Sequence, residues 1–222
     1  GAEFIKEPFL HLEIKNFLSR DHLDTLLSDD QIHFKEQPDD ETLIQTLLGK
    51  GYDIQNFPGC CTDPRDYLNR LQNNDWPSDI KGTPIESYGI TFRLSKYKND
   101  KIAKLIDFLN GTDFKTALET KFGIRHQNSI ITAIQKNLTK YEITPHPDTK
   151  RKALTYLLNI NKDDSVEGYD VHTHLLKFKK EYEHIYKVWD DTKNLDRCWV
   201  PWNLCESKKT IRENNSIVLF SP

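Results

Sequence analysis

The chain lacks several features that would assign it to a familiar class of protein. It has no methionine, and its opening residues, Gly1-Ala2-Glu3-Phe4, are typical of a remnant left by cloning. No apolar stretch approaches the length of a membrane span, and no secretory signal peptide is recognisable. Neither sign of charge is in large excess, because the formal net charge is -3. We therefore expect a cytoplasmic protein that binds neither membranes nor nucleic acid.

Several catalytic motifs are also absent. The sequence contains no G-x-S-x-G, G-x-x-x-x-G-K or G-x-G-x-x-G motif. It therefore gives no evidence for the nucleophile turn of a hydrolase, for a phosphate-binding P-loop or for a dinucleotide-binding site. The four cysteines, Cys60, Cys61, Cys198 and Cys205, lack metal-finger spacing and predict free thiols in a reducing compartment. Cys60 or Cys61 could act as a nucleophile, although the sequence identifies no histidine partner for either.

Helical patterns dominate the first part of the chain, after one predicted strand at 8–14. Ser19 and Asp63 are suited to cap helix N-termini, and Gly123 is suited to end a helix. A second strand is predicted at 87–94, and 73–84 is loop-like. Apolar residues at helical spacing predict helices at 20–28, 40–49, 63–71, 100–110 and 113–122.

Strands replace helices from residue 129 onward. A long loop at about 179–207 carries Trp189, Trp199 and Trp202. Helices followed by antiparallel strands predict one α+β domain, with a β-sandwich or jelly-roll core at 129–222 and a supporting region at 5–128. The strands are predicted at 129–138, 141–148, 153–161, 171–178, 208–212 and 216–220.

His146-Pro147-Asp148 is the most informative motif. Side chains at i and i+2 of a β-strand point to the same face, so His146 and Asp148 could reach one metal ion from the predicted strand. Together with a second histidine, such a pair makes the facial triad of non-haem Fe(II) oxygenases. Pro145 and Pro147 indicate a strand end or edge, since proline cannot donate to a sheet ladder. The alternative is a proline-rich turn capped by Asp148.

Two other patterns are compared with this motif. His22-Leu23-Asp24 has the same spacing on a predicted helix, where residues two apart do not converge, and we interpret it as a surface pair. His172-Thr173-His174 is either a rival metal pair or the polar face of an ordinary strand. Trp199-Val200-Pro201-Trp202 could line a ligand cleft, but packing of the long loop is the favoured interpretation.

Four segments resemble the Fe(II)- and 2-oxoglutarate-dependent oxygenases, in the broad group that includes prolyl 4-hydroxylases. Residues 8–18 resemble their first strand and helix entry, and 141–148 resemble their iron-binding strand. Residues 152–159 resemble the next strand, with Leu157-Leu158-Asn159 in place of its "YLN"-like signature. Residues 214–221 resemble the strand before the second iron-binding histidine. The resemblance implies a double-stranded β-helix, a cupin-like jelly roll with N-terminal helices packed against it.

The resemblance also implies a function and a set of residues. His146 and Asp148 would be two of three Fe(II) ligands, and 2-oxoglutarate would be the cosubstrate for hydroxylation of an unactivated C–H bond. Thr155 is a candidate contact for the cosubstrate. Lys152 is a weaker candidate, because side chains alternate between the two faces of a strand and Lys152 would lie on the face opposite to Thr155. The family's second histidine and its basic residue would follow residue 220, so we expect the sequence to omit them. The substrate would be a small molecule or a protein side chain.

Two alternatives remain open. One is a non-catalytic binding module on the same jelly-roll core. The other is a sugar-modifying cupin that uses His146, His172 and His174.

Overall fold

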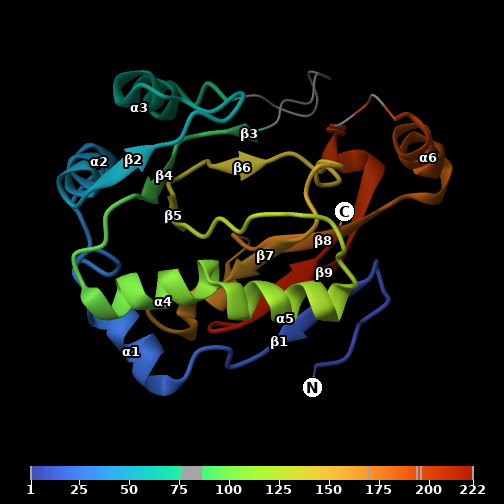
Figure 1. Ribbon diagram of the computed structural model, residues 1–222. Coiled ribbons are helices and arrows are strands. Elements are labelled where there is room, and N and C mark those ends of the chain that lie inside the picture. The colour runs from blue at the N-terminus through green and yellow to red at the C-terminus, as the bar shows by residue number, and fades with distance from the viewer. Residues whose placement is uncertain (1, 77–86, 170, 194, 196, 222) are drawn as a thin grey trace. The chain divides into compact units, whose positions relative to one another are not determined.

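The computed structural model describes residues 2–76, 87–169, 171–193, 195 and 197–221 (Figure 1). The chain forms two compact units: residues 1–27 with 145–222, and residues 28–144. The described strands form four small antiparallel sheets rather than a closed barrel, alongside several helices. The expected mixture of helices and antiparallel strands is therefore confirmed at this level. The division into units differs from the expected boundary near 128, because β5 and β6 lie in the second unit.

The first unit is built on a three-stranded sheet of order β1-β10-β7. These strands are β1 (His11–Ile14), β10 (Ile217–Phe220) and β7 (Thr155–Leu158). β10 occupies the centre and pairs antiparallel with both neighbours, so Phe220 lies opposite both His11 and Thr155. Its apolar run Ile217-Val218-Leu219 is almost completely buried, as expected for a central strand covered on both faces.

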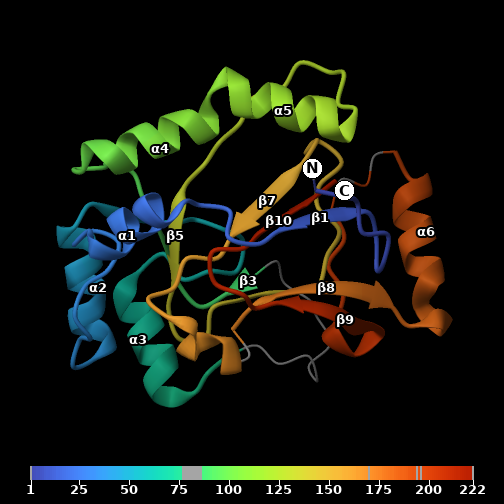
Figure 2. The ribbon, with the colours of Figure 1, turned by 90° about the horizontal axis from the view of Figure 1, so that it is seen from below.

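A second sheet in this unit pairs β8 (Thr173–Phe178) with β9 (Cys205–Ile211). Leu175, Ile211 and Val218 form one buried cluster, with Phe9 and Phe220 packed against it, so the two sheets share a core. Figure 2 shows β7, β10 and β1 side by side, with the β8–β9 pair near them. The unit also carries α1 (Arg20–Ser28), α6 (Glu183–Asp191) and the short 3-10 turns η2 (Asp164–Gly168), η3 (Lys180–Tyr182) and η4 (Trp202–Leu204).

The second unit contains a sheet of order β2-β4-β5 and a two-stranded sheet of β3 and β6. In Figure 1, α4 and α5 follow each other along one line. The strands are β2 (Tyr52–Ile54), β3 (Ser87–Tyr88), β4 (Thr91–Leu94), β5 (Ile134–Asn137) and β6 (Glu142–Ile143). The helices are α2 (Asp40–Gly49), α3 (Pro64–Asn73), α4 (Asp100–Asn110) and α5 (Thr112–Phe122).

Local capping signals in the sequence set the helix boundaries. Asp39 and Asp63 each accept a hydrogen bond from a backbone N–H in the first turn of the helix that follows, and Pro64 occupies the first position of α3. Gly123 ends α5 in the left-handed conformation, with φ 68°. The predicted helices 40–49 and 100–110 are confirmed residue for residue.

Gly89 divides what the sequence predicted as one strand at 87–94. Its φ is +80°, and a Cβ added there would lie 2.6 Å from Tyr141 Cα and 2.7 Å from Lys140 O. Only glycine tolerates both conditions without strain. β3 therefore pairs with β6 before Gly89, and β4 pairs with β2 and β5 after it.

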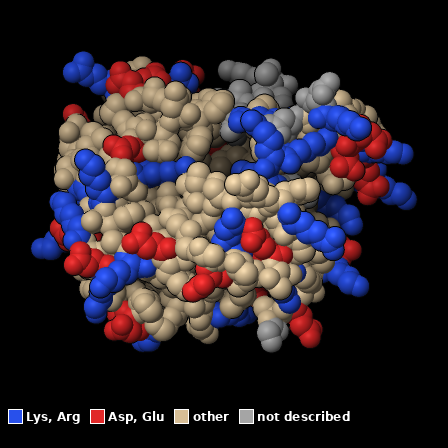
Figure 3. Space-filling view, in the orientation of Figure 1, with Lys and Arg blue, Asp and Glu red and all other residues tan. Residues whose placement is uncertain are grey.

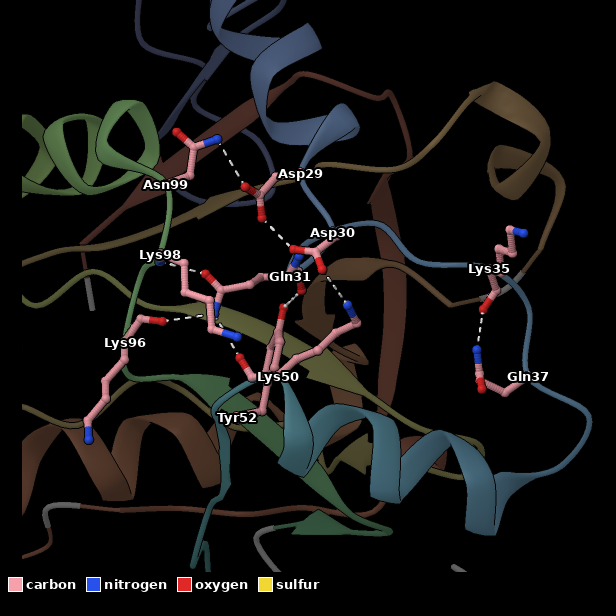
Figure 4. Close-up of polar contacts among 10 residues, drawn as sticks. All are labelled: Asp29, Asp30, Gln31, Lys35, Gln37, Lys50, Tyr52, Lys96, Lys98 and Asn99. Carbon is pink, nitrogen blue, oxygen red and sulfur yellow. Dashed lines mark hydrogen bonds and ion pairs between the residues drawn. The ribbon is translucent and has the colours of Figure 1, made fainter.

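A buried amide at Gln31 joins three segments of the second unit (Figure 4). Its side chain donates from Nε2 to Lys50 O at 2.7 Å and to Lys96 O at 2.9 Å, and Oε1 accepts from Lys98 N at 2.7 Å. The Tyr52 hydroxyl donates to the Gln31 carbonyl at 2.9 Å. Because Gln31 is only 1% exposed, these hydrogen bonds replace water that cannot reach the site.

Several predictions differ from the structure. The predicted loop at 179–207 contains α6, η3 and η4, and most predicted strands are shorter than expected. The predicted loop at 73–84 lies largely outside the described residues. No described helix combines the length and apolar character that crossing a bilayer requires. Acidic and basic side chains are interspersed on the face shown in Figure 3.

Candidate site around Asp148

The carboxylate of Asp148 is the centre of the predicted site. Lys152 Nζ donates to Oδ1 at 2.6 Å, and the Thr155 hydroxyl donates to Oδ2 in a very short hydrogen bond. The Asp148 side chain is 9% exposed, whereas that of Lys152 is 50% exposed. A nearly buried carboxylate is thus held in one orientation by a strand hydroxyl and a solvent-facing ammonium.

The prolines determine the local backbone. β6 ends at Ile143, and residues 144–149 are irregular. The prediction that His146 and Asp148 lie on a strand is therefore wrong. Pro145 and Pro147 have no N–H to donate to a ladder, and the Pro145 carbonyl instead accepts from Val200 N at 3.0 Å.

A turn brings Lys152 to Asp148. Lys152 N donates to Thr149 O at 2.9 Å, and β7 begins only at Thr155. The expectation that strand parity turns Lys152 away from Thr155 is wrong, because both side chains reach the same carboxylate. Side chains alternate between two faces only within a strand, and Lys152 lies in the turn that precedes β7.

His146 is exposed to solvent, in contrast to the nearly buried Asp148 side chain. Its imidazole and the Asp148 carboxylate are both groups that Fe(II) accepts in proteins. Among the described residues, however, no group of three or more His, Cys, Asp and Glu side chains is placed to hold a metal ion. The fit to an iron centre is therefore partial: two suitable ligand types are present, and Lys152 holds the position beside Oδ1 that a cation would take.

The end of β10 lies beside this carboxylate segment. Phe220 pairs with Thr155, and the Ser221 hydroxyl donates to Ala153 O at 3.1 Å. Because β10 runs antiparallel to β7, its C-terminal end lies at the N-terminal end of β7, which follows the Asp148 turn.

Lys150 connects the same turn to α6, and the sequence analysis did not identify it. Its Nζ donates to the carbonyls of Trp189 at 2.6 Å, Asp190 at 3.1 Å and Thr192 at 3.0 Å, and it lies 4.6 Å from the Trp189 ring centroid. These carbonyls belong to the C-terminal end of α6, where cations are favoured. A contact across about 40 positions has no local sequence signal.

The other histidine patterns have different partners. His22 Nδ1 lies 2.8 Å from Ser19 Oγ, and Asp24 pairs with Arg20 at 3.0 Å, so the surface interpretation of that pair is confirmed. His172 Nε2 lies 3.0 Å from Val166 O, and His174 Nδ1 lies 2.9 Å from Ser207 Oγ. The contacts of His172 and His174 thus involve different neighbours, and in the described part of the chain neither belongs to a group of three or more potential metal ligands.

The remaining candidates also have specific neighbours. The Trp202 ring packs edge-on against His174, with centroids 5.6 Å apart, which shows loop packing at this residue. Cys60 Sγ lies 3.1 Å from Ser87 Oγ. Burial raises the pKa of the Cys61 thiol to about 11, which disfavours the thiolate that a nucleophile requires.

Comparison with known proteins gave no match: no protein-family model, no curated protein and no solved structure matches this chain.

Proposed function

We propose that this protein is an Fe(II)- and 2-oxoglutarate-dependent oxygenase that hydroxylates an unactivated C–H bond, with His146 and Asp148 as two iron ligands. The observation that supports this most is the Asp148 carboxylate, nearly buried and oriented by Thr155 at the start of β7. When bound, Fe(II) would supply the redox chemistry with oxygen and 2-oxoglutarate. The protein's own residues hold and orient the reactants.

Thr155 would act as an orienting residue. A carboxylate ligand is usually fixed by a hydrogen bond from a neighbouring group, and its loss typically lowers metal affinity 10- to 100-fold. The Thr155 hydroxyl donates to Oδ2, which leaves Oδ1 as the oxygen directed to a cation. Thr155 thereby supports the ligand role of Asp148 while remaining a candidate cosubstrate contact.

Lys152 would change partner when a metal binds. Its ammonium now compensates the Asp148 charge at 2.6 Å, a role that a bound cation would replace. The half-exposed side chain has four rotatable methylenes and can turn toward an anionic group nearby. A carboxylate of 2-oxoglutarate is such a group, so Lys152 is a second candidate cosubstrate contact.

The proposal also includes the fold of the first unit, which we infer to be a double-stranded β-helix. Two small sheets that share the Leu175, Ile211 and Val218 core are compatible with a double-stranded β-helix, a cupin-like jelly roll. Any residues that continue from β10 would leave the sheet beside Ala153, near the Asp148 turn. That end of the sheet is where a third ligand would complete the centre.

The two H-x-D motifs provide a matched test. Asp148→Ala and Asp24→Ala remove the same group from the same tripeptide pattern, and thermal stabilisation by Mn(II), an air-stable substitute for Fe(II), is measured with and without 2-oxoglutarate. We expect stabilisation of the unmodified chain and of Asp24→Ala, and none for Asp148→Ala. Equal stabilisation of both variants would contradict the assignment of Asp148, and no stabilisation of the unmodified chain would favour the non-catalytic module.

Two further variants should act in opposite directions. Thr155→Val should weaken Mn(II) binding about 10- to 100-fold, because the carboxylate loses its orienting donor. Lys152→Met should strengthen it, because the competing ammonium is removed from Asp148. Succinate release from 2-oxoglutarate then tests the reaction itself.

A further inference from the structure

The two faces of the sheet β2-β4-β5 differ in character. Residues directly opposite each other, and residues two apart on one strand, point to the same face. One face carries Tyr52, Phe92 and Leu94, which are buried, and Lys136, whose Nζ lies 5.2 Å from the Phe34 ring centroid. The other face is polar, and it carries Asp53, Thr91, Arg93, Gln135 and Asn137.

Four of these polar side chains form a chain of hydrogen bonds. Arg93 Nε donates to Gln135 Oε1 at 3.0 Å, and Gln135 Nε2 donates to Asn137 Oδ1 at 2.9 Å. The Thr91 hydroxyl donates to the same Asn137 oxygen at 2.6 Å. Because a guanidinium can only donate, the atom of Gln135 that faces Arg93 must be its oxygen, and this fixes the orientation of both amides. Both amide oxygens are therefore already accepting hydrogen bonds, and only donors remain for a ligand.

The guanidinium of Arg93 is held in place with its outer edge open. Its Cζ lies 5.0 Å from the centroid of the Phe57 ring, so the side chain is fixed by a cation–π contact as well as by Gln135. Asp53 lies opposite Arg93 in the sheet, but within the described residues no ion pair or hydrogen bond reaches Arg93 Nη1 or Nη2. Both atoms are accessible to solvent, and Asn137 is exposed. An oriented guanidinium edge of this kind is suited to bidentate binding of an oxyanion.

We propose that Arg93 and Asn137 form a binding site on this polar face for the carboxylate group of a small molecule. The two Nη groups donate to the carboxylate oxygens, and Asn137 Nδ2 supplies a further donor. One guanidinium matches the single charge of a carboxylate, which accepts up to about four hydrogen bonds. A phosphate monoester carries a charge of about −1.5 to −2 at neutral pH and is disfavoured by Asp53 beside a single arginine. The proposal is independent of the Asp148 centre, because it uses none of that centre's residues.

The test uses acetate as the probe and the metal-free, ¹⁵N-labelled chain. Sodium acetate replaces sodium chloride at constant ionic strength, and NMR follows the Arg93 Nε–H and Asn137 side-chain NH₂ signals. We expect saturable shifts with a dissociation constant on the order of 1–10 mM, as suits a ligand of four heavy atoms. Shifts that do not saturate would overturn the proposal, and tighter binding of inorganic phosphate in a parallel titration would overturn its assignment to a carboxylate.

Three variants separate the geometry of the site from its charge. Arg93→Lys keeps the charge but loses the two-pronged donor, so acetate should bind about tenfold more weakly. Asn137→Asp replaces the free NH₂ by a second carboxylate oxygen at an exposed position, so binding should be lost. Arg65→Lys, at an exposed residue of α3, should leave binding unchanged. Undiminished acetate binding by either site variant, with folding checked by circular dichroism, would refute the inference.

Discussion

Replacement of Gln31 by leucine tests whether a single buried amide holds three segments of the second unit together. The change keeps approximate side-chain size but removes two donors and one acceptor. It leaves the carbonyls of Lys50 and Lys96 and the N–H of Lys98 without their present partner. Since Gln31 is 1% exposed, water cannot easily replace the amide.

The magnitude follows from the groups left behind. Each buried backbone group without a partner costs about 1–3 kcal/mol of folding free energy, and carbonyls tolerate the loss better than N–H groups. We therefore expect Gln31→Leu to lower the free energy of unfolding by about 3–5 kcal/mol. This is a large share of the roughly 5–15 kcal/mol that stabilises a typical domain.

Urea unfolding followed by circular dichroism measures the effect as a shift of the midpoint, about 1–2 M to lower urea at typical slopes. Gln37→Leu is the matched control. Gln37 Nε2 donates to Lys35 O at 2.6 Å, and its Oε1 accepts from Thr46 Oγ1 at 3.2 Å. Because Gln37 is only partly buried, water can reach these groups, so the loss should stay near about 1 kcal/mol, well below that of Gln31→Leu. Similar losses for the two variants would refute the reasoning, because burial would then not determine the cost.

Three other predictions follow from single contacts. Gly89→Ala should lower the free energy of unfolding by at least about 3 kcal/mol, because the added Cβ would overlap backbone atoms and φ is positive. Gly168→Ala is the control: a Cβ added there has no heavy atom within 4 Å, so the free energy of unfolding should change by under about 0.5 kcal/mol. Lys150→Met should speed amide hydrogen exchange at the C-terminal end of α6, since three carbonyls lose their donor; unchanged exchange would contradict that role. Burial raises the pKa of the Cys61 and Cys205 thiols to about 11. Alkylation of both thiols at pH 8 should therefore be about two orders of magnitude slower than in the unfolded chain, and it should accelerate as the pH rises. Equal alkylation rates before and after unfolding would contradict this prediction.

Helices were the most predictable part of the fold. Their signals are local: Asp39 and Asp63 cap the turns that follow them, and apolar residues recur at helical spacing. α6 was missed because its segment falls within 179–207, which was predicted as a long loop between strands. Its C-terminal end is held by Lys150, from a distant part of the sequence.

The sequence identified the residues of the candidate site better than their arrangement. Asp148, Lys152 and Thr155 were all named, and the structure brings their side chains together. The strand assigned to His146 and Asp148 was wrong, because two prolines stop ladder formation after Ile143. Lys152 was assigned to the face opposite Thr155, because side chains alternate along a strand. That alternation does not hold in the turn where Lys152 lies.

The sequence by itself determined where the helices of the first part of the chain lie, the free thiols and the identity of the polar groups, because those properties depend on residues close together in the chain. Only the tertiary structure decided that Gly89 divides two sheets, that Gln31 joins three segments, and that Lys136 lies over the Phe34 ring. These outcomes depend on which distant backbone approaches each residue. Hydrogen bonding and burial act over a few ångströms of space, whatever the separation along the chain.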